Sequence, residues 1–393
     1  MSQPPRIVVT GVGLHTGHGD TQATWTALAE NRSALTCERA WNLHAADSAT
    51  EQRFPAAPAP DASPVEFLAD RKLVKYMGPC TQMAVLAAGR ALRDAGLIET
   101  AADRESMGLF LATGPIAFDV EQALASFGQD VANDLLALRH EGLRRCHPLL
   151  PFKMLLNMPL GLVSIVFGIK GPNFILYPGA EQGACALAHA LRGLRRGRFV
   201  RALVGGSAST LGLAPIMNLR RVGKLASSIE AALPFSEQHA GWAPADQAAF
   251  LVLETEAEAA RRGRVPHACL DSVEVSGEGA ADRLWDLIPR PPQAVFPVAT
   301  LAAADLCADR GRARARWTTP QTFASADGLL GVAPAASFLL ATSLACLSLR
   351  QRRVPAPITE DATARETDCA LVTFRDCQSA ATALLSTVSE GVS

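Results

Sequence analysis

The sequence predicts an α/β fold with buried sheets, and three observations support this. Short runs rich in β-branched residues alternate with segments of helical periodicity, an order typical of α/β proteins. Hydrophobic residues make up 49% of the 393 residues and charged residues only 19%, which allows a large core and excludes disorder. The length is two to three times that of a usual domain of roughly 150 residues, so a duplicated domain or two packed domains is expected.

The N-terminal part contains clear element boundaries. The expected elements are strands at residues 6–10 and 107–113 and helices at 20–30 and 81–95, with an Ala-, Pro- and Asp-rich surface segment at 40–66. Asp20 is the expected N-cap of the first helix, because its carboxylate can accept from free backbone N–H groups. Gly96 is the expected C-terminal cap of the second helix, since glycine adopts a left-handed conformation without strain.

The remaining elements continue the alternation. The expected strands cover residues 174–177, 202–204, 250–254, 268–275, 370–373 and 380–385, and the expected helices cover 182–195 and 335–347. The charged segment 256–264 is the best candidate boundary, which divides the chain into an N-terminal half, residues 1–255, and a C-terminal half, residues 256–393. Residues 309–316 alternate arginine with small residues and are predicted to form a solvated basic loop.

Charge and cysteine usage exclude several classes of function. The chain has 37 basic and 38 acidic residues, a net charge of −1, so we expect no nucleic-acid partner and no membrane partner. Its nine cysteines are scattered without a C-x-x-C pair, which disfavours a disulfide framework or a zinc site, and we expect no metal and no cofactor. No apolar run of about 18 residues occurs, and a cytoplasmic protein is predicted.

A glycine-rich turn after the first strand admits a dinucleotide-binding interpretation. Gly11, Gly13 and Gly17 follow a β-branched run, as in motifs that bind a pyrophosphate at a helix N-terminus. However, the third glycine comes one residue late, and no strand ends in an acidic residue placed to bind a ribose. An ordinary turn is therefore the preferred interpretation.

A more specific set of motifs spans nearly the whole chain. The motif strings are Arg6-Ile-Val-Val-Thr-Gly-Val-Gly13, Asn157-Met-Pro-Leu-Gly161, Gly168-Ile-Lys-Gly-Pro-Asn173, Pro234-Phe235, Gly241-Trp242 and Leu329-Leu-Gly331. Together they resemble the β-ketoacyl synthase family of thiolase-fold condensing enzymes. The resemblance implies a thiolase-like duplicated five-layer α-β-α-β-α fold with a shortened C-terminal half.

The catalytic residues of that family are replaced in this chain. Condensing enzymes need a cysteine thiolate, two imidazoles and backbone N–H groups for the oxyanion. The resemblance puts Ala180 at the position of the cysteine and Thr300 and Gly328 at the positions of the two histidines. Asp376 falls in the loop that normally supplies an oxyanion donor. Cys185 lies inside the predicted helix, about one and a half turns beyond the position of the nucleophile.

This pattern resembles the non-catalytic subunits called chain-length factors. The implied function is to pair with a catalytic ketosynthase paralogue, and through that complex with an acyl carrier protein, in type II fatty-acid-like, aryl polyene or polyketide biosynthesis. The resemblance implies that Phe118, Gln122 and Ala125 line the acyl tunnel of the partner. The implied dimer interface is the strand formed by Phe174, Ile175, Leu176 and Tyr177.

Two alternatives remain open at the level of sequence. The chain could be a divergent ketosynthase, decarboxylase or acyltransferase that uses Glu181, Gln182 or Cys185. It could also be a homodimeric binding protein for acyl chains that has no catalytic partner.

Overall fold

The computed structural model describes residues 4–37, 40–42, 51–99, 104–114, 148–177, 179–277, 281–299, 303–375 and 379–388. Within these residues the fold is built on one ten-stranded sheet that consists of two five-stranded halves. The strands of the N-terminal half-sheet are β1 (Ile7–His15), β4 (Gly108–Thr113), β5 (Asn173–Leu176), β6 (Arg201–Ser209) and β7 (Asp246–Thr255). Those of the C-terminal half-sheet are β8 (Ala268–Gly277), β9 (Ala294–Val298), β10 (Thr322–Phe323), β13 (Cys369–Arg375) and β14 (Ser379–Ser386).

The two half-sheets share one topology. The N-terminal half has the order β1-β7-β6-β4-β5, and the C-terminal half has the corresponding order β8-β14-β13-β9-β10. In each half the first two neighbouring pairs are antiparallel and the last two are parallel. The halves join where Val8 and Val9 of β1 pair with β8. The repeated order indicates an internal duplication, while the boundary at residue 255 stays a prediction.

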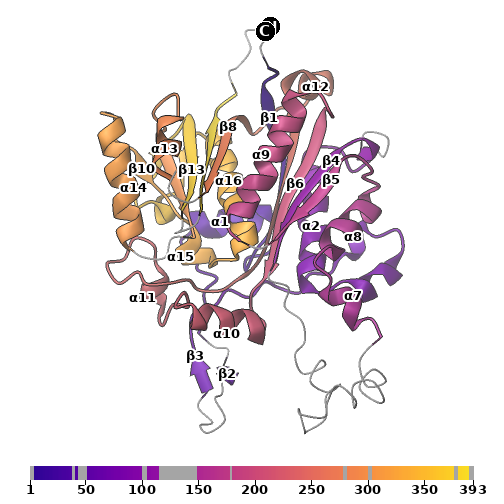
Figure 1. The fold of residues 1–393 in the computed structure, drawn as a ribbon, viewed down its shortest axis with the longest axis horizontal. Helices are drawn as coiled ribbons and strands as arrows, with labels where there is room; N and C mark the ends of the chain where they lie inside the picture. Colours follow the sequence, from indigo (N-terminus) through magenta and orange to yellow (C-terminus); the bar gives the residue numbers. More distant parts are fainter. Residues whose placement is uncertain are drawn as a thin grey trace.

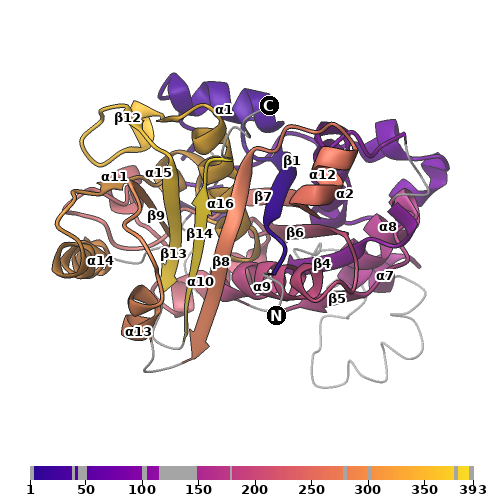
Figure 2. The same ribbon diagram turned by 90° about the horizontal axis from the view of Figure 1, so that it is seen from above.

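Helices complete a five-layer arrangement, which Figures 1 and 2 show from two directions. The central helices α9 (Glu181–Arg195) and α16 (Pro334–Arg350) contact each other and strands of both half-sheets. Helices α2 (Pro79–Asp94) and α8 (Met158–Phe167) cover the outer face of the N-terminal half-sheet, and α13 (Ala281–Asp286) and α14 (Ala303–Arg316) lie outside the C-terminal half-sheet. The predicted five-layer α/β fold is confirmed.

Shorter elements connect these layers. They are α1 (Thr21–Ala29), β2 (Ala40–Asn42), β3 (Glu51–Arg53), η1 (Pro64–Phe67), η2 (Arg71–Tyr76), α7 (Leu150–Met154), α10 (Leu213–Arg221), α11 (Ile229–Ala232), α12 (Glu256–Arg261), α15 (Asp327–Leu330), β11 (Arg353–Val354), η5 (Ala356–Ile358) and β12 (Arg365–Glu366). No helix in the described part of the chain is both long and apolar enough to cross a bilayer.

Local sequence signals explain the predicted helix ends. The carboxylate of Asp20 accepts a hydrogen bond from the backbone N–H of Ala23 at 2.8 Å, which confirms it as the N-cap of α1. Gly96 has a φ of +65° just beyond α2, which confirms the predicted glycine stop.

The glycines of β1 serve helix packing. A Cβ atom at Gly11 would lie 2.2 Å from the carbonyl oxygen of Ala91, and one at Gly13 would lie 2.0 Å from that of Ala87. Helix α2 can therefore rest directly on the strand only because both side chains are missing. This close approach accounts for both glycines without a bound dinucleotide.

The prediction of a solvated basic loop at residues 309–316 is wrong, because this segment lies within α14. Alanine and arginine both favour a helix, and Ala313 packs in a buried cluster with Trp285 and Phe323. The arginines pair with acids around the helix, for example Arg316 with Asp286 at 3.4 Å. Apolar contacts on one face and ion pairs on the others thus stabilise the helix.

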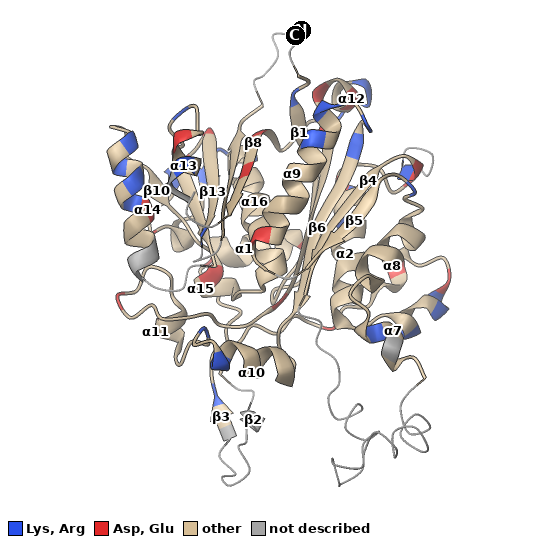
Figure 3. Ribbon diagram, in the orientation of Figure 1, with Lys and Arg blue, Asp and Glu red and all other residues tan. Residues whose placement is uncertain are grey.

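Charged side chains are distributed unevenly between the layers. Figure 3 shows them on the peripheral helices α12 and α14, whereas the central helix α16 is almost free of charge. All but a few residues of α16 are buried, and they are mainly Ala, Leu, Ser and Phe. Helix α16 therefore provides an apolar surface that both half-sheets contact.

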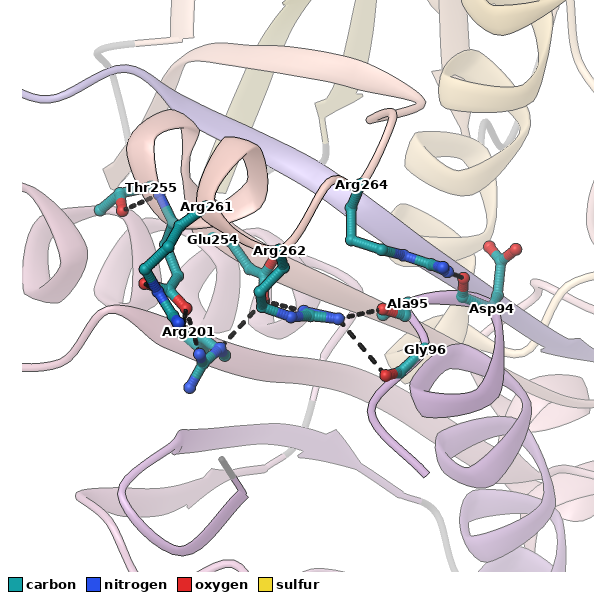
Figure 4. A network of polar contacts seen from close by, with 10 residues as sticks. Asp94, Ala95, Gly96, Arg201, Glu254, Thr255, Arg261, Arg262 and Arg264 are labelled. Carbon is teal, nitrogen blue, oxygen red and sulfur yellow. Dashed lines mark hydrogen bonds and ion pairs between the residues drawn. The ribbon is translucent and has the colours of Figure 1, made fainter. Parts of the chain in front are cut away.

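A buried ion-pair network connects α12 with the end of α2, as Figure 4 shows. Glu254 has a fully buried side chain, and its Oε1 accepts from Nε of Arg201 at 3.1 Å and from Nη1 of Arg262 at 2.6 Å. Arg262 also donates to the carbonyl oxygens of Ala95 and Gly96, just beyond α2. One guanidinium therefore neutralises a buried carboxylate and caps the C-terminal end of a helix.

Candidate functional site

Ala180 is the residue that the sequence resemblance puts at the position of the family's nucleophile. It is the N-cap residue of α9, it is 5% exposed, and its backbone is in the right-handed helical region. The preceding Gly179 has a φ of +135°, and a Cβ atom there would lie 2.3 Å from the carboxylate of Glu181. A tight turn therefore precedes the helix, and Ala180 presents a methyl group there.

A cavity of about 450 Å³ lies at this turn. It is lined by Gly114, Gly179, Ala180, Glu181, Thr210, Pro215, Asn218, Leu219, Val222, Lys224, Trp242, Pro334 and Phe374. Among the described residues of this lining, Lys224 and Glu181 are the only charged ones, and none is a cysteine or a histidine. The Nζ atom of Lys224 lies 4.8 Å from the centre of the Trp242 ring, a cation–π contact. The cavity is large enough for a small ligand, but its described lining residues supply no thiolate and no imidazole.

The segments next to Thr300 and Gly328, the two positions where the resemblance implies lost histidines, contact each other. The backbone N–H of Ala299, the residue before Thr300, donates to Oδ2 of Asp327 at 2.7 Å. The carbonyl oxygen of Ala299 accepts from Nε1 of Trp242 at 3.1 Å, which connects this contact to the cavity. Ala299 has a φ of +51°, a strained value for a residue with a side chain. Thr300 itself lies outside the described residues.

There is no room for an imidazole at Gly328. A Cβ atom there would lie 2.9 Å from Cδ of Pro234 and 3.0 Å from Cδ2 of Leu233. The half-buried Asp327 beside it has a desolvated carboxyl, and this burial raises its pKa to about 7. Packed apolar atoms and a weakly acidic carboxyl group thus surround Gly328.

Cys185 does not line the cavity. It is half-buried within α9, and burial together with nearby Glu181 raises the pKa of its thiol, which keeps it protonated at neutral pH. Gln182 donates to Oε1 of Glu181 at 2.6 Å.

Histidines elsewhere in the described residues have structural contacts. His15 is buried, and burial and Arg90 lower its pKa to about 4. The Nδ1 atom of His239 lies 3.0 Å from the carbonyl oxygen of Ala231, and His267 contacts Asp94 at 2.7 Å. None of these rings lies in the lining of the cavity.

The predicted interface strand is the outer strand of the sheet. β5 pairs with β4 and ends the strand order. The side chains of Phe174, Ile175 and Leu176 are half-buried, and Tyr177 is 45% exposed. Further exposed apolar side chains on α7, α8 and the turn between them are Phe152, Met154, Leu155, Leu156 and Ile165. The predicted tunnel residues Phe118, Gln122 and Ala125, like Asp376, lie outside the described residues.

Sequence reasoning missed part of the cavity. Lys224, Thr210 and Asn218 come from segments with no motif, so no sequence signal connects them with Ala180. Trp242 belongs to a string that matches the family, but its contact with Ala299 depends on the fold.

The comparisons with known proteins establish the family. A model described as "Beta-ketoacyl synthase, N-terminal domain" matches residues 5–259. Since this match covers more than half of the chain, the chain belongs to the β-ketoacyl synthase family. This is the class that the duplicated sheet and the turn before α9 indicate.

Curated relatives come from both fatty-acid and polyketide systems. The chain is 28% identical over 263 residues to a 3-oxoacyl-[acyl-carrier-protein] synthase 2 of Synechocystis, with 66% of this chain and 59% of the relative covered. It is 29% identical over 267 residues to the tetracenomycin polyketide synthase ketoacyl synthase beta subunit of Streptomyces glaucescens, with 66% and 61% covered. The matches thus span about six tenths of the length of these relatives.

Solved structures are similar over the whole chain. The ishigamide ketosynthase/chain length factor superposes with a TM-score of 0.79 at 19% identity, over 98% of this chain and 100% of that chain. A β-ketoacyl synthase of Burkholderia phymatum superposes with a TM-score of 0.80 at 20% identity, with the same coverage. At these identities the similarity shows the fold, which is the thiolase-like ketosynthase fold.

Proposed function

We propose that the chain is a catalytically inactive, chain-length-factor-like subunit that pairs with an active ketosynthase and shapes its acyl tunnel. The pathway would be type II fatty-acid-like, aryl polyene or polyketide biosynthesis. The observation that carries this proposal is Ala180 at the N-terminus of α9. An alanine cannot form the thioester that condensation requires. The beta subunit among the relatives and the ketosynthase/chain length factor among the similar structures support this proposal.

The other described positions support inactivity independently. Gly328 faces Pro234 and Leu233 at close range, so a histidine there would force the backbone to move. Cys185 is an inadequate substitute for the nucleophile, because it lies outside the cavity lining and its thiol is protonated. The divergent-enzyme alternative would then depend on Glu181, which is bonded to its neighbour Gln182.

Pairing with another subunit would cover an exposed edge. β5 has no strand beside its outer edge within the described residues, and the apolar side chains of α7 and α8 are exposed nearby. An uncovered apolar edge strand promotes aggregation. We expect an antiparallel pairing of β5 with the equivalent strand of the partner, with an interface above about 2,000 Å². The acyl carrier protein would then be bound by the complex.

Acylation of the isolated chain tests the loss of catalysis. The purified chain is incubated with an acyl-carrier-protein thioester, and its intact mass is measured. We expect no acyl adduct on the wild type and no malonyl-dependent chain extension by Ala180→Cys, since each missing acid–base or oxyanion group costs about 100-fold or more. A stable adduct on Cys185, or extension by the single mutant, would refute the proposed inactivity.

Product length tests the tunnel role. In the reconstituted pair, Ala125→Phe should shorten the product by one or two extension cycles and Phe118→Ala should lengthen it. Each excluded methylene loses about 0.8 kcal/mol of burial, and a steric clash adds to this loss. Gln122 would share the same tunnel face. Unchanged product lengths in complexes that still assemble would contradict a tunnel role for these residues.

A further inference from the structure

A second cavity, of about 420 Å³, lies at the C-terminal end of α9, near the start of β5. It is lined by Phe110, Pro172, Asn173, Phe174, His189, Arg192, Gly193, Arg196, Arg198 and Phe199. Cavities of roughly 300–1,000 Å³ with an apolar lining and a few polar groups are typical small-molecule sites. None of these residues belongs to the cavity at Ala180.

Aromatic rings form the interior of this cavity. The ring centres of Phe110 and Phe174 are 5.1 Å apart, and those of Phe110 and Phe199 are 5.6 Å apart. The ring of His189 packs edge-on against Phe174 at 4.7 Å. Burial and Arg192 lower the pKa of His189, so this ring is neutral at pH 7. The site therefore presents aromatic surfaces suited to a flat apolar group.

A glycine shapes this interior at some cost to the helix. A Cβ atom at Gly193 would lie 2.3 Å from the ring of Phe199, so the ring can rest against α9 only at a glycine. Glycine inside a helix is about 1 kcal/mol less favourable than alanine.

Three arginines give the cavity a strong positive charge. Arg192, Arg196 and Arg198 are exposed, and none of them forms an ion pair within the described residues. No acidic residue is among the described residues that line the cavity. The helix dipole accounts for Arg192 and Arg196 at the end of α9, but Arg198 lies beyond the helix. Guanidinium groups bind phosphates and carboxylates in a bidentate manner and stack on aromatic rings.

We propose that this cavity is a binding site for a planar aromatic anion, a ring that carries a phosphate or a carboxylate. The ring lies among Phe110, Phe174 and His189, and the anionic group is bound by Arg192, Arg196 and Arg198. Neither the ring nor the anionic group alone should bind as tightly as the whole ligand, because the aromatic side chains contact the ring and the guanidiniums neutralise the charge.

This site shares Phe174 with the predicted interface strand, but ligand binding there does not depend on the proposed subunit function. Pairing through β5 would use the outer backbone edge of the strand, whereas the cavity uses the face toward α9, where Phe174 packs. Binding of the anion requires no catalytic partner, so it can be measured on the purified chain.

Calorimetric titration of the full chain tests the site with three probes. The probes are 2-naphthyl phosphate, 2-naphthol, which lacks the anion, and inorganic phosphate, which lacks the ring. We expect one molecule of 2-naphthyl phosphate to bind per chain, at least tenfold more tightly than either of the other probes. Arg192→Ala/Arg196→Ala should weaken this binding at least tenfold, and Phe174→Leu should weaken it severalfold.

A matched control is available in another helix. Arg220 and Arg221 are exposed in the last turn of α10 and line none of the cavities described above. Arg220→Ala/Arg221→Ala should change the affinity less than twofold, and thermal unfolding checks that each variant is folded. Equal affinity for inorganic phosphate, no binding of 2-naphthyl phosphate, or equal losses in both double variants would overturn the proposal. These outcomes leave the acylation test of the proposed function unaffected.

Discussion

Substitution of Arg262 by alanine tests what the buried ion-pair network contributes to folding. In the native chain Arg262 pairs with the fully buried Glu254 at 2.6 Å and caps the carbonyl oxygens of Ala95 and Gly96. Arg262→Ala removes this cation and leaves the carboxylate with Arg201 as its partner, at 3.1 Å.

The expected loss follows from burial. Removing one partner of a buried ion pair costs about 3–5 kcal/mol, because the other charge remains in a poorly solvated place. Arg201 still compensates part of the charge of Glu254, so we expect the lower limit, about 3 kcal/mol of unfolding free energy. The matched control is Arg261→Ala, since Arg261 is 63% exposed and its partner Glu258 keeps Arg201 as a second partner. Removal of this exposed cation leaves no carboxylate unpaired, so we expect a loss of only about 0–1 kcal/mol.

Urea unfolding, followed by circular dichroism, measures both variants under the same conditions. Glu254→Gln, introduced into Arg262→Ala, should recover part of the loss because it removes the undercompensated charge. The reasoning fails if Arg262→Ala loses no more stability than Arg261→Ala, or if Glu254→Gln makes the Arg262→Ala variant still less stable.

Three further predictions concern single positions. Gly13→Ala should lower the unfolding free energy by several kcal/mol in urea titrations, because its Cβ would lie 2.0 Å from the carbonyl oxygen of Ala87. Gly277→Ala is the control and should be nearly neutral, because its Cβ would have nothing within 4 Å. Equal effects of the two substitutions would contradict the packing argument. Asp327 has a folded pKa of about 7 against 3.8 in the unfolded chain, so its contribution to stability is full below about pH 4 and is lost as the pH rises through 7. Asp327→Asn should therefore make the unfolding free energy less dependent on pH between pH 4 and 8, and should stabilise the chain at pH 8 by about 1–2 kcal/mol. A tenfold change in proton affinity is worth about 1.4 kcal/mol, and the partial exposure of Asp327 reduces the full effect. An unchanged dependence of stability on pH would refute this prediction. Gly328→His should lower the midpoint of thermal unfolding without creating decarboxylase activity, because Pro234 and Leu233 occupy the space that the new side chain would need. A stable variant with decarboxylase activity would contradict this prediction.

Local features of the fold could be predicted from sequence because their causes are local. Asp20 caps the nearest free N–H groups, and Gly96 supplies a left-handed residue where the helix must stop. The expectation that Ala180 stands at the family's nucleophile position also comes from the sequence, because the motif strings around it define its position along the chain. The segment 309–316 was predicted wrongly, because contacts with distant residues such as Trp285 and Phe323 stabilise its helix.

The composition of both cavities was decided only by tertiary structure. Lys224 and Trp242 line the same cavity as Ala180. Phe174, Phe110 and His189 line the second cavity together. The fold brings these remote segments side by side. The same holds for Ala299 and Asp327, which are joined by a hydrogen bond. A sequence shows which side chains are present and how they repeat along the chain. Which of them share a cavity depends on sheet topology and close packing, which no local pattern encodes.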